Sequence, residues 1–262
     1  HETLLELAQQ PAQAKPRPAN AVQKENKGAQ RKVGQPYEAV YINLAKRMDR
    51  RRDIERSLRS IGVVASRFEA RTGAETPVQV VQLTWDSTLN ASYDTKQRAH
   101  PAVRMTAGER GCCLSHAVLW SRLAARPDDS PPLLVLEDDV VFKEGFADGV
   151  ERVVQMVEHS MPPSRRTTLA YLGADVAEWT PNAPPIPVGN RLRLRSARYL
   201  WCTHAYVIWP AAARTMLATL PIDLPIDNFI SRAVLRRDVT ALVIQPYLAC
   251  QASPYANGDI VH

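Results

Sequence analysis

Three consecutive acidic residues, Glu137, Asp138 and Asp139, directly follow the apolar run 133–136. A run of that length, introduced by two prolines, is too short for a helix and predicts a strand buried on both faces. Open α/β sheets bind ligands in the crevice beyond the carboxyl ends of such strands. Adjacent carboxylates placed there repel one another and lose hydration, so they need a cation or strong donors. The pattern indicates a divalent-metal site, with a solvated turn as the alternative.

The chemistry of this acidic triplet favours a hard cation. Mg²⁺ and Mn²⁺ prefer oxygen ligands, and a cation held by one or two carboxylates completes its coordination with water and substrate phosphates. The triplet therefore predicts Mn²⁺ or Mg²⁺ together with a phosphate-bearing substrate.

The elements before the triplet predict an α/β fold. The β-branched and aromatic run 39–44 predicts a strand, and apolar residues then recur at helical spacing over 54–61 until Gly62 ends the helix. The segment 63–70 predicts a second strand. This order is typical of a parallel βαβ unit.

Polar side chains in the loop after the first strand suit a nucleotide. Asn43, Arg47 and Arg50 can hold a base and its phosphates if this strand ends at the same crevice as the acidic triplet. Arg51 and Arg52 follow directly, and for at least two of these three consecutive arginines a solvated helix face is the simpler interpretation.

The segment 105–126 gives the clearest helix signal. Thr106 and Glu109 form a capping box, and Arg126 with the following proline ends the helix. His116 lies one turn after Cys112, as in a thiol–imidazole pair. A histidine satisfied within the core is the favoured interpretation, because no neighbouring residue in the sequence would orient it as a base.

The second half of the chain predicts alternating elements. They are a helix at 145–159, a strand at 168–175 that ends in Asp175, a strand at 204–210, a helix at 212–220, and a last strand with an irregular tail within 239–251. The stretch 176–192 contains four prolines and predicts a long loop that acts as a lid or acceptor wall. The segment 221–230 predicts a proline-stiffened turn carrying Asp223 and Asp227.

Size and charge narrow the class of protein. The chain has 262 residues, enough for one large α/β domain, with a formal net charge of +6 and a pI near 9.3. Its basic clusters, within 46–71 and 191–198, lack the interleaved aromatics of a nucleic-acid platform. The four cysteines show neither metal-ligand nor disulfide spacing, which favours a reducing compartment.

Six motifs, taken in order, resemble glycosyltransferase family 25, the lipooligosaccharide and collagen-type galactosyltransferases. They lie at 41–51, 106–120, 133–142, 171–173, 203–217 and 225–230. The resemblance covers about 40–251, and the helix motif that contains Cys112 and His116, followed by the acidic triplet, is its most specific part.

The resemblance implies a GT-A-like, Rossmann-like nucleotide-sugar transferase domain with a mostly parallel central sheet. It implies inverting transfer of a hexose, with galactose expected, from a UDP-sugar to the saccharide of a lipooligosaccharide or similar surface glycan. Glu137 and Asp139 match the outer positions of a metal-binding D-x-D motif, and Asp138 lies between them on the donor side. His204, in the family-like segment 203–217, is a further metal ligand or, equally, a supporting core residue.

Inversion requires a carboxylate base within hydrogen-bond reach of the acceptor hydroxyl. Asp227 is the first choice because a proline-braced turn holds it, and Asp175 is the second. A role for Asp227 as the cap of a helix that begins near Asn228 is an equally good interpretation.

Domain organisation follows from the amino-terminal composition. Residues 1–36 contain no aromatic residue and predict a disordered basic tail or linker, with a tether to an anionic membrane as an alternative. Residues 37–262 are expected to form a single glycosyltransferase domain. No stretch approaches the ~18 apolar residues of a membrane span. The expected localisation is therefore cytoplasmic, with peripheral contact at the inner membrane left open.

Two other classes of function remain as alternatives. One is a protein on the same fold that binds nucleotide or glycan without turnover, although the intact triplet and both later carboxylates argue against it. The other is a nucleic-acid-binding or nucleotidyltransferase protein, which only the charge and the acidic triplet suggest.

Overall fold

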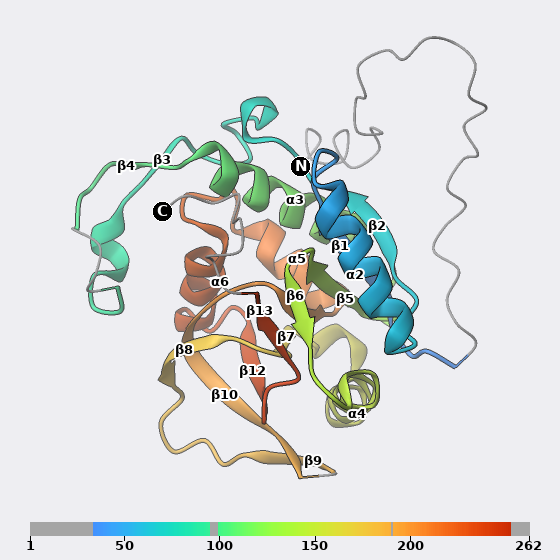
Figure 1. Cartoon of the computed structure of the whole chain (residues 1–262). Helices are drawn as coiled ribbons and strands as arrows, with labels where there is room; N and C mark the ends of the chain where they lie inside the picture. The colour runs from blue at the N-terminus through green and yellow to red at the C-terminus, as the bar shows by residue number, and fades with distance from the viewer. Residues whose placement is uncertain (1–33, 95–98, 190, 253–262) are drawn as a thin grey trace, which may run out of the picture.

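The computed structural model of the protein describes residues 34–94, 99–189 and 191–252. Its centre is a nine-stranded sheet in the order β2-β1-β5-β11-β7-β12-β10-β8, with β9 beside β10 (Figure 1). The strands are β1 Glu38–Asn43, β2 Ser66–Glu69, β5 Leu133–Glu137, β7 Thr168–Tyr171, β8 Asp175–Trp179, β9 Ile186–Gly189, β10 Leu192–Trp201, β11 Ala205–Ile208 and β12 Thr240–Gln245.

Strand direction confirms the α/β fold with a mostly parallel central sheet. β1 is parallel to β2 and to β5, and β12 is parallel to β7. β11 lies antiparallel between β5 and β7, so those two neighbours point the same way. β10 is the second reversed strand, antiparallel to β12, β8 and β9. Apart from these two reversed strands, the strands run in one direction, so the sheet contains both parallel and antiparallel pairs.

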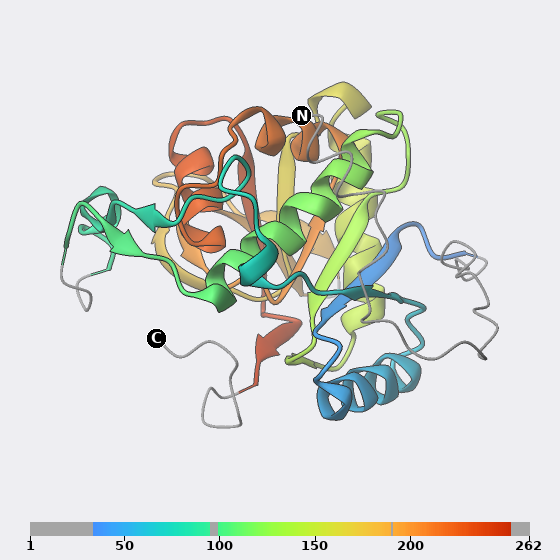
Figure 2. The same ribbon diagram turned by 90° about the horizontal axis from the view of Figure 1, so that it is seen from above.

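Helices cover both faces of the sheet. Successive side chains of a strand point to opposite faces, and on each face they pack with helices in a separate apolar cluster. The helices are α2 Met48–Ser60, α3 Ala107–Ala124, α4 Phe146–Ser160, α5 Pro210–Ala218 and α6 Ile226–Leu235. α3, α5 and α6 pack on one face, and α2 and α4 pack on the other (Figures 1 and 2). The result is a three-layered domain whose central strands are shielded from water.

Short elements complete the domain around this body. The pairs are β3 Thr84–Trp85 with β4 Val103–Arg104, and β6 Val140–Phe142 with β13 Ala249–Gln251. Three short 3-10 helices are η1 Gly73–Glu75, η2 Ser87–Asn90 and η3 Pro163–Arg165. The segment from β3 to β4 carries η2 and extends from the body of the domain (Figures 1 and 2).

Local sequence signals located several elements well. The run 133–136 is completely shielded except at Leu133, which is 7% exposed, so the buried strand is confirmed. The capping box of α3 is present: the Thr106 hydroxyl accepts the Glu109 amide at 3.1 Å, and the Glu109 carboxylate accepts the Thr106 amide at 2.6 Å. Pro210 begins α5 instead of ending a strand, as its missing N–H allows.

Other expectations were wrong. The predicted loop 176–192 contains most of β8 and all of β9. These strands form because β10 supplies their backbone partners, which the polar sequence of 176–192 does not indicate. The predicted strand 168–175 ends at Tyr171. The predicted turn 221–230 ends early, since α6 begins at Ile226.

Of the predicted basic tail, residues 1–36, the structure describes only 34–36, because residues 1–33 lie outside the described residues. Gln35, which the prediction placed in the tail, is buried, and its amide donates to the carbonyls of Tyr37 and Val64 at 3.0 and 3.3 Å. Gln35 therefore packs with the domain and does not belong to a solvated tail. Within the described ranges, none of the helices has the length and apolar character needed to cross a membrane.

Candidate active site

A cavity of about 430 Å³ opens beside the end of β5. Its lining comes from α3, α6, several strand ends and the segment after η2. The lining residues are Tyr93, Asp94, Glu109, Cys112, Glu137, Asp175, Trp201, Cys202, Thr203, Pro225, Ile226, Asp227 and Gln251. Five of these carry carboxylates and none is Lys, Arg or His, so the cavity has a strongly negative potential.

Glu137 is the member of the acidic triplet that faces this cavity. The Thr203 hydroxyl donates to Oε1 of Glu137 at 2.6 Å, and His116 Nε2 lies 3.6 Å from the same oxygen. Burial would raise the pKa of Glu137, but His116 and Thr203 together bring it below its ordinary value. The carboxylate is therefore ionised at neutral pH despite its surroundings.

Asp138 turns the other way, toward the predicted nucleotide loop. The amide of Asn43 donates to its Oδ2 at 2.7 Å, and the Arg50 guanidinium donates to its Oδ1 at 2.9 Å. Arg67 donates to the Asn43 side-chain oxygen at 3.0 Å, which fixes the orientation of that amide. Burial raises the pKa of Asp138 above its ordinary value, although both donors oppose the shift. Asn43, Arg50 and Asp138 thus meet, as their placement in the sequence predicts.

Asp139 is less well satisfied. Its Oδ2 lies 3.5 Å from Arg50 and accepts the Gln251 amide at 3.2 Å. Its Oδ1 is buried and has no hydrogen-bond partner among the described residues. Burial and the neighbouring charge of Glu137 raise the pKa of Asp139 to about 6. This oxygen is accordingly available to a cation.

A second hollow, of about 410 Å³, lies between α2 and β6. Asp138 and Asp139 line it together with Arg47 and Arg50. The Arg47 guanidinium pairs with Asp49 at 2.8 Å, and its backbone carbonyl accepts the side-chain amide of Asn43 at 3.1 Å. The acidic triplet therefore divides between two cavities, with Glu137 on one side and the two aspartates on the other.

His204 lies beside Glu137 but lines neither cavity. Its backbone carbonyl accepts the Glu137 amide at 3.0 Å, directly before β11 begins. Its ring is buried against Gly173, where an added Cβ would come within 2.8 Å of Nε2. Burial lowers the pKa of His204, so the imidazole is neutral at pH 7. Neither ring nitrogen makes a hydrogen bond of good geometry to a described residue.

Asp227 lies in the first turn of α6. The helix begins at Ile226 after Pro225 in the cap position, so the interpretation of Asp227 as the cap of a helix starting near Asn228 was wrong. Its Oδ1 accepts the Asn228 amide at 2.8 Å, and its Oδ2 accepts the Cys202 amide at 3.5 Å. Burial raises the pKa of Asp227 above its ordinary value. A positioned carboxylate with raised proton affinity suits a general base.

Asp175 borders the same cavity at its rim. It is exposed, begins β8 and pairs with Trp201 across the ladder. The structure therefore brings Glu137, Asp175 and Asp227 to one cavity, while Asn43, Arg47, Arg50, Asp138 and Asp139 gather around the second hollow. His204 adjoins the first group through the backbone.

Three possible metal ligands lie close together that the sequence analysis did not combine into one site. The ligand atoms of Cys112, His116 and Glu137 lie within 4.8 Å of one another, a spacing that a metal ion can bridge. Within the described ranges, no such close group joins Glu137 to Asp139 and His204. Burial raises the pKa of Cys112 well above its ordinary value, so its thiol is protonated.

Several lining residues escaped sequence reasoning. Tyr93 stacks on Tyr199 with ring centroids 3.8 Å apart and donates to Glu178 at 2.8 Å. Trp201 donates from its indole to Asn228 at 3.2 Å. Leu and Arg alternate at 192–195, inside a basic cluster. This alternation is a strand signal, and it is the one feature that could have indicated the strand that carries Trp201.

The family model for glycosyltransferase family 25, described as an LPS biosynthesis protein family, matches residues 38–230. The chain belongs to glycosyltransferase family 25. The matched region includes the acidic triplet, α3 and the start of α6, so both catalytic candidates lie within the family 25 match.

Curated relatives from animals share this family 25 region. The chain is 31% identical over 195 residues to the probable inactive glycosyltransferase 25 family member 3 of Bos taurus, covering 74% of this chain and 31% of that protein. It is 30% identical over 191 residues to a glycosyltransferase 25 family member of Drosophila melanogaster, covering 72% and 29%. It is 27% identical over 195 residues to procollagen galactosyltransferase 2 of Mus musculus, covering 74% and 29%. The matched region thus spans under a third of each of these relatives.

Proposed function

We propose that this family 25 chain is an inverting, UDP-sugar-dependent hexosyltransferase, with galactose as the transferred sugar. The observation that carries the proposal is the 430 Å³ cavity, which gathers Glu137, Asp175 and Asp227 from β5, β8 and α6. Inverting transfer needs a carboxylate on the acceptor side of the sugar and charge stabilisation on the leaving-group side. We assign the carboxylate to Asp227 in this cavity and the charge stabilisation to Arg47 and Arg50, which line the second hollow.

Asp227 is the proposed general base. Its two backbone donors, the amides of Cys202 and Asn228, hold the carboxylate while it faces the cavity. Burial raises its pKa and so increases its affinity for a proton, and the acceptor hydroxyl would lose its proton to it as the bond to the sugar forms. Asp175, at the rim, is the second candidate.

The donor nucleotide is assigned to the side of the acidic triplet that carries arginines. Arg47 and Arg50 line the second hollow, and Asn43 is fixed by Arg67 at the end of β1. Guanidinium groups bind phosphate oxygens through paired N–H donors. Asp138, held by Asn43 and Arg50, would keep these donors in place.

The residues around Asp139 fit a divalent cation. Its buried Oδ1 lacks a partner among the described residues, and the charge of Glu137 disfavours its ionised form, as expected where a cation completes the charge balance. Asp139 would supply one hard oxygen ligand for Mn²⁺ or Mg²⁺, and Glu137 and His204 would join it only if their ligand atoms moved closer, because no such close group unites the three among the described residues. Such a cation, when bound, stabilises the negative charge that develops on the leaving diphosphate. Unchanged cation affinity in His204→Ala would remove His204 from this set.

The acceptor is proposed to be a saccharide of a lipooligosaccharide or similar surface glycan. Tyr93 and Trp201 form an aromatic part of the cavity wall, and binding sites combine such apolar rings with a few polar groups. A lipid-linked acceptor would bring the chain to an anionic membrane. Arg52, Arg56 and Arg59 are exposed on α2 for that contact. Salt-sensitive sedimentation with anionic vesicles would support the membrane contact, and its absence would contradict it.

A panel of UDP-sugars tests the proposed function. Each sugar is incubated with the chain and a saccharide acceptor, with Mn²⁺ or with chelator, and released UDP is measured. We expect release with a UDP-hexose, dependent on acceptor and metal. Tight UDP binding without release would instead support a binding protein on the same fold. Four mammalian relatives are named inactive or probable inactive family 25 members, which supports this second candidate.

A further inference from the structure

We propose that His116 is a positioning residue for Glu137, and that the Tyr206 hydroxyl sets the imidazole tautomer that this role requires. The residues involved are Trp120 and His116 on α3, Tyr206 on β11 and Glu137 at the end of β5. The catalytic consequence rests on the proposed function, whereas the hydrogen-bond arrangement does not depend on it.

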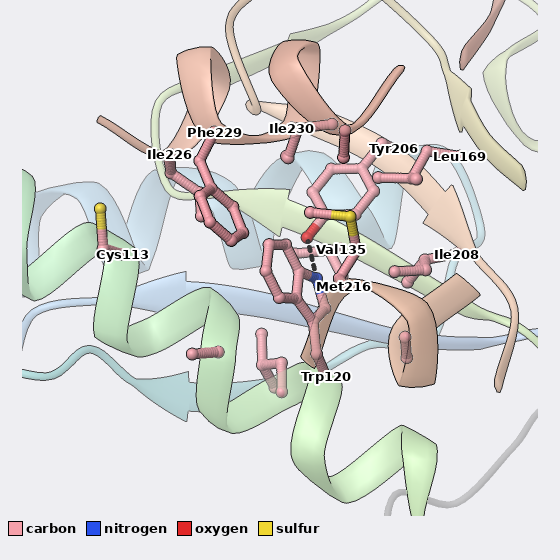
Figure 3. Close-up of a cluster of buried hydrophobic side chains, with 14 of the residues drawn as sticks. Cys113, Trp120, Val135, Leu169, Tyr206, Ile208, Met216, Ile226, Phe229 and Ile230 are labelled. Atoms are coloured by element: carbon pink, nitrogen blue, oxygen red, sulfur yellow. Dashed lines mark hydrogen bonds between the residues drawn. The ribbon is translucent and has the colours of Figure 1, made fainter. Parts of the chain in front are cut away.

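The arrangement begins at Trp120. Its indole nitrogen donates to the Tyr206 hydroxyl at 3.0 Å, within a cluster of apolar side chains (Figure 3). Both side chains are completely buried. Because an indole N–H can only donate, the Tyr206 oxygen accepts this bond and its own proton must find another acceptor.

His116 provides that acceptor. Its Nδ1 lies 2.8 Å from the Tyr206 hydroxyl, and burial raises the pKa of Tyr206 well above its ordinary value, so the phenol keeps its proton. If Nδ1 accepts the phenolic proton, the neutral imidazole carries its own proton on Nε2. The opposite tautomer would make the Tyr206 oxygen accept twice and leave its proton without a partner in a fully buried site.

Glu137 selects the same tautomer from the other side. His116 Nε2 is buried, lies 3.6 Å from Glu137 Oε1 and has no hydrogen-bond partner among the described residues. An N–H directed at a carboxylate oxygen is attracted to it, whereas a nitrogen lone pair would be repelled. The separation is longer than a formed hydrogen bond, which is common in active sites before substrate binds.

All donors in this series therefore point toward the cavity: Trp120 to Tyr206, Tyr206 to His116 and His116 to Glu137. Thr203 donates to the same oxygen, Oε1. Because both contacts reach Oε1, the other oxygen of Glu137 is left for a ligand in the cavity. The buried series thus fixes the orientation of the carboxylate, as outer partners do for metal-binding groups.

Histidine ¹⁵N NMR tests the tautomer directly. The chain has six histidines, and His116 is assigned as the signal lost in His116→Gln. Long-range ¹H–¹⁵N correlation should show the Nε2–H tautomer in the native protein. Tyr206→Phe removes the hydrogen bond that Nδ1 accepts and should shift the Nδ1 resonance of His116, while Nε2 keeps its proton because it still faces Glu137. Tyr171→Phe is the matched control, because it removes a hydroxyl from a ring whose centroid is only 5.8 Å from that of Tyr206.

The control should leave the His116 signals unchanged. An Nδ1–H tautomer in the native protein would overturn the proposal, and this result needs no variant to fold. Zn²⁺ titration provides a second way to contradict it. Loss of the Nε2 proton on Zn²⁺ addition, abolished in Cys112→Ser, would show that His116 is a metal ligand instead.

The functional consequence is measured separately. Tyr206→Phe should weaken Mn²⁺-dependent UDP binding by about tenfold or more, while UDP binding in chelator stays the same. Equal losses with and without Mn²⁺ would point to general damage and contradict the positioning role. A native Nε2–H tautomer in a chain that transfers no sugar would support the hydrogen-bond arrangement and refute the proposed function alone.

Discussion

The backbone amide of Cys202 points at the Asp227 carboxylate, with 3.5 Å between the nitrogen and Oδ2. Cys202 adopts φ = +74°, a conformation that is uncommon for a residue with a side chain. Such a backbone costs of order 1–3 kcal/mol and persists only where its surroundings enforce it. The connection between β10 and β11 is thus strained in a way that directs a donor to the proposed base.

Asp227→Asn tests the base. The amide cannot take the acceptor proton, so kcat should fall by ~10²-fold or more while UDP affinity stays nearly the same. Steady-state kinetics and calorimetry measure the two quantities. Asp223→Asn is the matched control, since Asp223 lies in the same segment, pairs with Arg232 and does not line the cavity. Near-normal transfer by Asp227→Asn would move the role to Asp175.

Asp139→Asn tests the metal. Loss of one ligand charge should abolish Mn²⁺-dependent UDP binding, because Asp139 supplies the unpartnered buried oxygen at the site. Isothermal titration with UDP, in Mn²⁺ and in chelator, makes the measurement. Asp148→Asn, on the exposed side of α4, should bind UDP as the native chain does. UDP affinity that is unchanged in the variant and in chelator would refute the metal role.

The raised pKa of Asp139 predicts a pH-dependent cost to stability. The folded-state pKa is about 6 against an ordinary value of 3.8, so the folded chain holds this proton more tightly than the unfolded chain. The cost is absent below pH ~4, grows as pH rises and is complete above pH ~6, where it reaches about 3 kcal/mol. In chelator, Asp139→Asn should therefore be more stable than the native chain at pH 7.5.

The measurement is urea unfolding at two pH values. The advantage of Asp139→Asn should shrink at pH 5, where part of the native population is protonated at this site. A variant that is less stable than the native chain at pH 7.5 would show that Arg50 and Gln251 stabilise the charge more than burial penalises it.

Arg50→Ala tests the nucleotide side. The guanidinium contacts both Asp138 and Asp139, so its loss removes a phosphate donor and the positive charge that faces these two carboxylates. UDP affinity should fall by about tenfold, which corresponds to ~1.4 kcal/mol. Arg52→Ala, on the exposed side of α2, is the control and should bind UDP normally. Equal affinity for the two variants would place the nucleotide elsewhere.

Local patterns were enough to predict the parts of the fold that depend on local forces. The strand before Glu137 and the capping box at Thr106 each involve a few adjacent residues, and both are confirmed. β10 was missed because its partner changes along its length. It pairs with β12 up to Ala197 and then with β8, with register shifts between Ala197 and Leu200 that bend a strand.

The candidate site was predictable only where a residue follows a recognisable strand or motif. Glu137 and Asn43 end predicted strands, and Asp227 lies in a conspicuous proline-flanked segment. Tyr93 and Gln251 reach the cavity from distant parts of the chain, and no spacing rule links them to the acidic triplet. His116 is buried, as the sequence favoured, but its partners Tyr206 and Glu137 could not be predicted because they come from two other strands.

The sheet order also determines where this domain can be cut. The family match stops at residue 230, yet β12 lies beyond it and inserts between β7 and β10. A fragment ending at 230 would leave the interior strands β7 and β10 with unpaired edges, which are sites of aggregation. It would also lack Gln251, which donates to Asp139. An excised version that stays soluble and keeps the acidic triplet intact must therefore extend past residue 251.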